Sequence, residues 1–154
     1  MKKVNTNNFK KTLSKFSTGI TVVCVKNNNS IYGKTVNSFN SLSLNPPMVL
    51  FSLGNYSSSI KQFSKTKFLS INILSSKQKK LSDNFASTTP KLENIKFIEG
   101  KYKTAIIPNC IANLECKLID KIKKGDHIIF ICKILELQSN DKLKPLVYFN
   151  SKYF

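Results

Sequence analysis

ANLECKLIDKIKKGDHIIFICKILEL spans residues 112–137 and holds the clearest structural pattern in the chain. Within residues 112–118, apolar side chains alternate with Asn, Glu and Lys, which is typical of a β-strand with one face in water. Residues 123–126, Lys-Lys-Gly-Asp, suit a turn, and residues 127–137 are largely apolar. The stretch therefore predicts a half-buried strand, a turn and a second, long strand that is mostly buried.

Further strand signals lie on both sides of this pair. Runs of β-branched or apolar residues predict strands at residues 20–26, 31–39, 48–53, 68–74 and 145–149. The Asn-rich residues 27–30 suit a hairpin turn, and Asn45, Pro46 and Pro47 break the chain. Residues 88–108 show weak periodicity and are predicted to be a loop with brief regular structure.

Short helices are predicted at three places. Phe9, Leu13 and Phe16 recur at helical spacing near the start of the chain. Residues 57–63 follow with Ser57 as the expected cap. Residues 75–78, Ser-Ser-Lys-Gln, have the pattern of a capping box that opens a helix reaching Phe85.

About six strands and two or three short helices in 154 residues predict one domain, residues 1–154, that is mainly β. An antiparallel barrel, closed or partly closed, is the natural way for such strands to hide their edges. A Rossmann fold is disfavoured because the chain has five glycines and neither G-x-G-x-x-G nor a Walker A motif.

The net charge of +17 comes from 25 basic residues, all of them Lys and never more than two in a row. Dispersed charge usually solvates a surface, so no nucleic-acid partner is predicted, and a basic nucleic-acid-binding barrel is the least favoured alternative. No stretch approaches the ~18 apolar residues of a membrane span, and residues 1–11 lack the apolar core of a secretory signal. A cytoplasmic protein is expected.

Metal and hydrolytic chemistry find little support in the sequence. Cys24, Cys116 and Cys132 sit in strand-like runs and are expected to be reduced core residues, Cys110 lies outside them, and no metal site is predicted. The chain has one histidine, eight carboxylates without an obvious pair, and no G-x-S-x-G motif. Such a chain either binds a ligand or leaves its chemistry to a cofactor, so no catalytic side chain is predicted.

Three polar segments are candidates for binding. Residues 33–47 carry many small hydroxyl and amide side chains, which suit the polar pyrimidine edge of a flavin, although they also suit turns. Residues 55–59 precede a predicted helix, whose N-terminus could take a phosphate, although Ser57 could simply cap it. Asp126 could orient the ring of His127, although a histidine at the start of a strand is often structural.

The order of several short motifs resembles the flavin reductase-like family, from about Phe9 to Tyr153. These motifs are residues 16–23, 35–39 with 41–47, 72–74, 84–86, 114–116, 125–127, and 145–149 with Lys152 and Tyr153. The resemblance implies an FMN-binding split β-barrel, a homodimer, and an NAD(P)H-dependent flavin reductase. Such an enzyme passes a hydride from NADH or NADPH to FMN or FAD, often for a separate monooxygenase.

The resemblance also implies which residues bind each cofactor. The flavin residues are Thr35, Val36, Asn37, Ser38, Ser41, Leu42, Ser43, Asn55, Ser57, Ser58, Ser59, Phe85 and Ala86. The nicotinamide residues are Asp126, His127 and Tyr153. The chain departs from the family in having no Arg, so its phosphate contact must come from Lys, Ser or backbone. A flavin-binding electron-transfer protein without reductase turnover is the main alternative.

Overall fold

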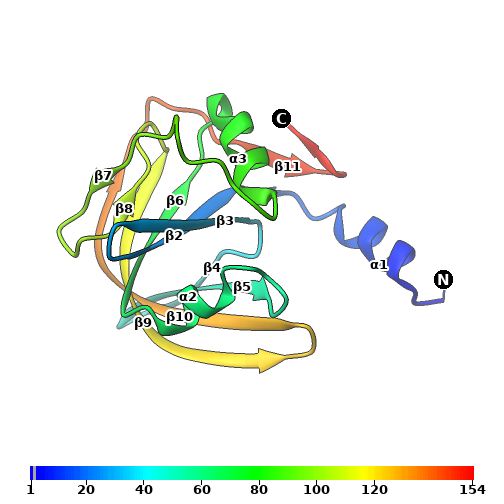
Figure 1. Cartoon of the computed structure of the whole chain (residues 1–154). Helices are drawn as coiled ribbons and strands as arrows, with labels where there is room; N and C mark the ends of the chain where they lie inside the picture. The colour runs from blue at the N-terminus through cyan, green and yellow to red at the C-terminus, as the bar shows by residue number, and fades with distance from the viewer. Residues whose placement is uncertain (2) are drawn as a thin grey trace.

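The computed structural model describes Met1 and residues 3–154. Its main element is a seven-stranded antiparallel sheet in the order β3-β2-β6-β9-β10-β5-β4, which curves into an open barrel (Figure 1). The strands are β2 (Thr21–Asn27), β3 (Ser30–Val36), β4 (Asn40–Leu44), β5 (Pro47–Gly54), β6 (Phe68–Ile73), β9 (Ala112–Lys124) and β10 (His127–Ser139).

Smaller elements surround this sheet. A three-stranded sheet joins β1 (Thr18–Gly19), β11 (Val147–Phe149) and β12 (Lys152–Tyr153), and β7 (Ile98–Glu99) pairs with β8 (Ala105–Ile106). The helices are α1 (Thr6–Leu13), α2 (Ile60–Lys65), the 3-10 turn η1 (Ser76–Gln78) and α3 (Lys79–Ala86). The predicted class, mainly antiparallel β with a few short helices, is confirmed. No helix in the described residues is long and apolar enough to cross a bilayer.

The β9–β10 hairpin confirms the strongest sequence pattern. Its two strands pair antiparallel from His127 opposite Lys124 to Ser139 opposite Ala112, so both run further than predicted. Gly125 has φ +56 in the connecting turn, a left-handed conformation that glycine adopts without a Cβ penalty. The hairpin therefore forms the long side of the barrel, and its turn delivers His127 to one end of it.

Two boundary predictions are wrong. Ser57 does not cap α2, which begins three residues later with Ser59 at the cap position and no side-chain capping bond. The strand predicted at 31–39 ends at Val36, and residues 40–44 form the separate edge strand β4, which the sequence did not predict. Ser and Asn dominate β4 and have low β propensity, so its pairing with β5 forms the strand.

The capping box at residues 75–78 is confirmed, because the Ser75 backbone N–H donates to Gln78 Oε1 at 2.9 Å. It opens the 3-10 turn η1, and α3 follows directly. The loop predicted at 88–108 is also confirmed, with only the short strands β7 and β8 inside it.

An aromatic cluster fills the barrel. The rings of Phe51 and Phe130 stack with centroids 5.1 Å apart, and Phe63 from α2 meets both edge-on. All three side chains are fully buried. Offset stacked and edge-to-face pairs are the favoured aromatic arrangements, so this cluster fixes α2 against β5 and β10.

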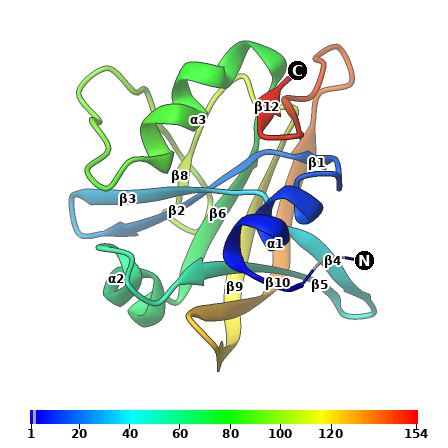
Figure 2. The same cartoon turned by 90° about the vertical axis from the view of Figure 1, so that its right-hand side faces the viewer.

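A second apolar cluster packs residues of β2 and β8 with Phe85 of α3. Figure 2 shows α3 beside these strands. Phe85 of α3 is fully buried and packs on Gly33 of β3, where any Cβ would collide with its ring. The four cysteines are free and buried, as predicted for three of them. Burial raises the pKa of the Cys110 thiol to about 11, so this thiol stays protonated at neutral pH.

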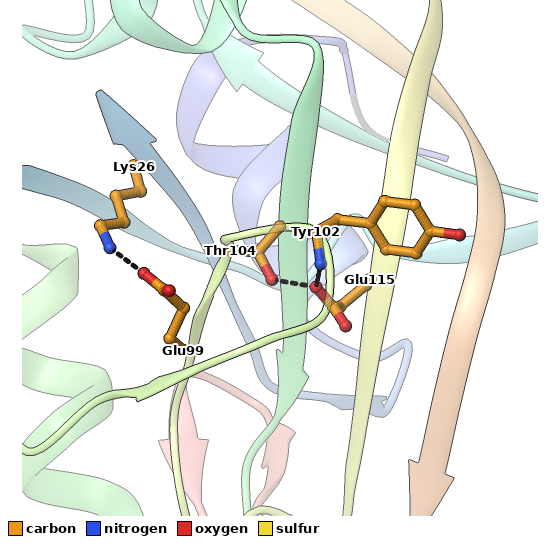
Figure 3. Close-up of polar contacts among 5 residues, drawn as sticks. All are labelled: Lys26, Glu99, Tyr102, Thr104 and Glu115. Carbon is orange, nitrogen blue, oxygen red and sulfur yellow. Dashed lines mark hydrogen bonds and ion pairs between the residues drawn. The ribbon is translucent and has the colours of Figure 1, made fainter. Parts of the chain in front are cut away.

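The 98–106 segment is held by a buried carboxylate. Glu115 of β9 accepts hydrogen bonds from the backbone N–H of Tyr102 (2.9 Å) and from Thr104 Oγ1 (2.7 Å), as Figure 3 shows. It also accepts one from the backbone N–H of Lys101 (3.0 Å). An ion pair between Lys26 and Glu99 ties the same segment to β2. These contacts fix a loop to which the sequence assigned no role.

Candidate functional site

A cleft of about 400 Å³ opens where β3 and β5 end and β10 begins. In both views β3 runs between α3 on one side and α2 on the other (Figure 1, Figure 2). Predicted site residues that line the cleft are Thr35, Val36, Asn37, Ser38, Ser57, Ser58, Ala86 and His127. Its volume lies within the roughly 300–1,000 Å³ common for small-molecule sites.

The register of the sheet brings these distant segments together. His127 lies opposite Gly54 across the β10–β5 pair, and the Asn55 backbone N–H donates to the Asp126 carbonyl at 2.9 Å. Ser38 closes the barrel between the end of β3 and β5. Its hydroxyl accepts from the Ser52 N–H at 3.0 Å and donates to the Ser52 carbonyl at 3.2 Å.

Two hydroxyl groups of the cleft donate to protein carbonyls. The Thr35 hydroxyl donates to the Ser82 carbonyl of α3 at 2.7 Å, and the Ser38 hydroxyl donates to the Ser52 carbonyl of β5. Asn37 is exposed, and its amide makes no hydrogen bond within the described part of the chain. The free amide offers both donors and an acceptor, which is what the pyrimidine edge of a flavin requires.

Residues 87 and 88 form a strap along one side of the cleft. Lys34 Nζ donates to the Ser87 carbonyl at 2.8 Å, and Ser58 Oγ donates to the Thr88 carbonyl at 3.1 Å. Beyond the strap lies a second cavity of about 340 Å³, which shares Lys34, Ser58 and Thr88 with the cleft. Partial burial lowers the pKa of the Lys34 ammonium below its usual value.

His127 stands at the rim of the cleft. Its Nδ1 lies 2.7 Å from Asp126 Oδ1, which orients the ring and leaves Nε2 free. The hydrogen bond from His127 lowers the pKa of the Asp126 carboxyl. Asp126 itself does not line the cleft, so it acts on the site through His127.

Other predicted site residues lie outside the cleft lining. Ser41, Leu42 and Ser43 belong to the edge strand β4, and Asn55 lies beside the cleft with its backbone bonded to residue 126. Phe85 is buried under β3, and Ser59 lines the second cavity. For these residues, contact with a cofactor stays a prediction that the cleft does not support.

Tyr153 also lies away from the cleft lining, against the buried Ser82 of α3. Its hydroxyl is 3.0 Å from Ser82 Oγ, and its ring packs edge-on against Tyr148. Because the Ser82 carbonyl also accepts from Thr35, Tyr153 is connected to the cleft only indirectly, through Ser82 of α3.

The cleft also contains residues that sequence reasoning missed. Lys34 lies within the polar stretch 33–47 but is not one of the predicted flavin residues, and Tyr56, 78% exposed, lies within the predicted phosphate segment. Ser87 and Thr88 fall in the loop without a predicted role. The isolated Lys34 beside a run of small polar residues was the one available signal. Among the described residues, no group of three or more His, Cys, Asp or Glu is placed to hold a metal.

The cleft combines apolar walls from Val36, Leu53 and Ala86, an exposed tyrosine ring, one free amide group and a cation. This arrangement defines a site for a flat, partly polar ligand that carries an anionic tail. A flavin has this chemistry, and the residues present fit it. The cleft is not the largest hollow, since an open groove of about 680 Å³ lies along α3, but it collects the motif residues.

Comparisons with known proteins give the same assignment. The model of the flavin reductase like domain matches residues 13–154. FMN reductase (NADH) SmoA of Agrobacterium fabrum is 33% identical over 137 residues, which cover 89% of this chain and 79% of that protein. The reductase component of 4-hydroxyphenylacetate 3-monooxygenase from Thermus thermophilus is 32% identical over 145 residues, covering 94% and 93%.

The solved structure of flavin reductase PheA2 in its native state superposes with a TM-score of 0.92 at 32% identity, covering 98% of this chain and 97% of that one. The chain belongs to the flavin reductase-like family. The family and fold predicted from the sequence motifs are confirmed.

Proposed function

We propose that this chain is an NADH-dependent flavin reductase that binds FMN or FAD in the cleft. The observation that carries the proposal is that motif residues from three distant segments, 35–38, 57–58 and 127, line one cleft in a chain of this family. The bound flavin supplies the hydride acceptor, which explains why the chain has no catalytic triad or acid pair.

The residues of the cleft have separate tasks. Val36, Leu53 and Ala86 exclude water from the flavin ring, and the free amide of Asn37 binds its polar edge. Ser57 and Ser58 lie toward the ribityl and phosphate end of the cleft. His127 contacts the nicotinamide and, held by Asp126, orients it so that the two reacting rings stack.

The assembly is proposed to be a homodimer. α1 buries none of its side chains and projects from the barrel (Figure 1). Phe9 and Leu13 of α1, Phe16 just after it, and Leu44 of β4 are 57%, 53%, 74% and 94% exposed. Exposed apolar side chains of this kind suit a second copy of the same chain. Light scattering should give twice the 17.4 kDa chain mass.

The reduced flavin is proposed to serve a separate monooxygenase. Support comes from relatives that are reductase components of such systems, including the Thermus thermophilus protein. Coupled turnover with a flavin-dependent monooxygenase, supplied only with this chain, NADH and flavin, would test this step.

Steady-state oxidation of NADH with FMN, FAD or riboflavin tests the main proposal. NADH absorbance should fall only when a flavin is present, and NADPH should be used more slowly. Flavin binding without consumption of either nucleotide would leave a flavin-binding protein without turnover. Absence of both binding and turnover would overturn the assignment of the cleft.

A further inference from the structure

We propose that Lys34 recognises the phosphate of the flavin, so that the cleft distinguishes phosphorylated flavins from riboflavin. The inference rests on the proposed function, because it takes the cleft as the flavin site. It assigns a chemical task to a residue of β3 that precedes the family motif and was not among the predicted site residues.

Lys34 differs from the other lysines in its surroundings. Of the described lysines, only Lys26 and Lys34 are half-buried, and the rest are exposed. Lys26 has a carboxylate partner in Glu99. The ion pairs of the described chain do not include Lys34, whose ammonium meets only the neutral Ser87 carbonyl at 2.8 Å.

A half-buried ammonium without a counter-ion is poorly solvated, and an anion that enters beside it removes this cost. The ammonium has three N–H donors and uses one on Ser87, which leaves two for a ligand. Among the lining residues of the cleft, Lys34 is the one lysine, and no Asp or Glu accompanies it. The cleft therefore carries a positive charge, which is located at the Lys34 ammonium.

The Lys34 ammonium lies near Ser58, which belongs to the segment 55–59 that is expected to hold the phosphate. Lys34 and Ser58 both line the cleft, and they donate to the neighbouring carbonyls of Ser87 and Thr88, so the ammonium and the hydroxyl lie near the same short segment. α2 has six residues and begins only at Ile60, so its N-terminus offers little dipole to an anion. The positive charge for a phosphate must therefore come from a side chain, and Lys34 supplies it.

Equilibrium titration of flavin fluorescence separates the phosphate from the ring. Wild type, Lys34→Gln and Lys34→Arg are each titrated with FMN, FAD and riboflavin. Lys133→Gln is the matched control, because it removes the same charge from an exposed site on β10 outside the cleft. Lys34→Gln should raise the Kd for FMN and FAD about tenfold or more, since a hydrogen bond to a charged group is lost.

The Kd for riboflavin should stay within about twofold in Lys34→Gln, since riboflavin carries no phosphate. Lys34→Arg should keep most of the preference for FMN, and Lys133→Gln should keep all of it. The affinity of wild type for FMN should weaken with added salt more than that of Lys34→Gln. An NADPH titration identifies the other phosphate source: a larger loss for NADPH than for FMN would move Lys34 to the nicotinamide side.

Equal losses for FMN and riboflavin, or no loss for either, would overturn the role of Lys34 while reductase turnover leaves the proposed function intact. Wild-type protein that binds no flavin at all would instead overturn the proposed function. If Lys34→Gln does not fold, Lys34→Met keeps the aliphatic stem on β3 and gives the same comparison.

Discussion

Two polar regions of the molecule use similar residues in opposite ways. In β6, next to β9, the side chain of Asn72 accepts from the Ile107 N–H at 3.0 Å and from Asn113 Nδ2 at 2.8 Å. It donates to the Val22 carbonyl at 3.0 Å. Glu115 nearby accepts three further hydrogen bonds. Within the described residues, the cleft beside β3 instead leaves the Asn37 amide and two Lys34 donors without partners.

The difference separates a structural role from a binding role. Buried polar groups that are fully paired hold segments in place, and pairing leaves them nothing for a ligand. Polar groups at the cleft are half-solvated and only partly paired, so they are available for a ligand. The charges follow the same division, because Lys26 and Lys101 near Glu115 are matched by Glu99 and Glu136, whereas Lys34 is unmatched.

The largest expected effect is a loss of stability when the hydrogen bonds of Glu115 are removed. Glu115→Ala leaves two backbone N–H groups and the Thr104 hydroxyl without an acceptor, and each buried unpaired donor costs about 1–3 kcal/mol. We expect the free energy of unfolding to fall by about 3 kcal/mol or more, measured by urea denaturation. The flavin Kd below the unfolding transition should stay unchanged.

Glu115→Gln is the matched control, because it keeps one acceptor oxygen and should lose less stability. The opposite pattern is expected at the cleft, where Asn37→Ala should weaken flavin binding and leave unfolding unaffected. Equal stability of Glu115→Ala and wild type would show that the hydrogen bonds of Glu115 do not stabilise the fold, and the contrast with the cleft would be lost.

Sequence patterns predicted the scaffold better than the site. The β9–β10 hairpin followed from period-two alternation and a Lys-Lys-Gly-Asp turn, because both are local signals. β4 did not, since its Ser-rich sequence forms a strand only through its pairing with β5. The start of α2 was misplaced because three consecutive serines at residues 57–59 are equally good caps by sequence.

Site residues were found as three separate polar segments, and only the family motifs joined them. Their meeting depends on long-range register, such as His127 opposite Gly54, which no local pattern encodes. Lys34 was hidden among 25 basic residues, and its half-buried, unmatched state exists only in the folded chain.

The next largest effect is expected on the nicotinamide step when His127, at the rim of the cleft, is replaced. His127→Ala should slow hydride transfer or raise the KM for NADH by about tenfold, which corresponds to roughly 1.4 kcal/mol of lost contact. Flavin affinity and Tm should stay close to wild type, because the ring is half-exposed and bonded only to Asp126. Stopped-flow reduction of bound flavin measures the step directly. A lowered Tm with normal kinetics would make His127 structural.

A smaller effect is expected from single hydroxyls. Ser58→Ala should raise the flavin Kd about threefold, at the low end for one hydrogen bond because its proton is shared with the Thr88 carbonyl. Ser41→Ala is the matched variant: the sequence predicts flavin contact for Ser41, whereas the structure places it on β4 outside the cleft lining. Fluorescence titration of both variants decides between these placements, and a larger loss for Ser41→Ala would favour the sequence.

The smallest effect concerns pH and the unmatched Lys34. Its ammonium attracts a phosphate only while protonated, and partial burial lowers its pKa from the usual 10.5. The preference for FMN over riboflavin should therefore be full near neutral pH and decline as pH rises through the lowered pKa, before an exposed lysine would lose its proton. A ratio of the two Kd values, measured from about pH 7 to about pH 10, cancels ionisation of the flavin ring, which both ligands share. In Lys34→Arg the guanidinium stays charged throughout, so the ratio should be constant. A ratio that declines equally in Lys34→Arg would assign the titration to another group and remove Lys34 from phosphate recognition.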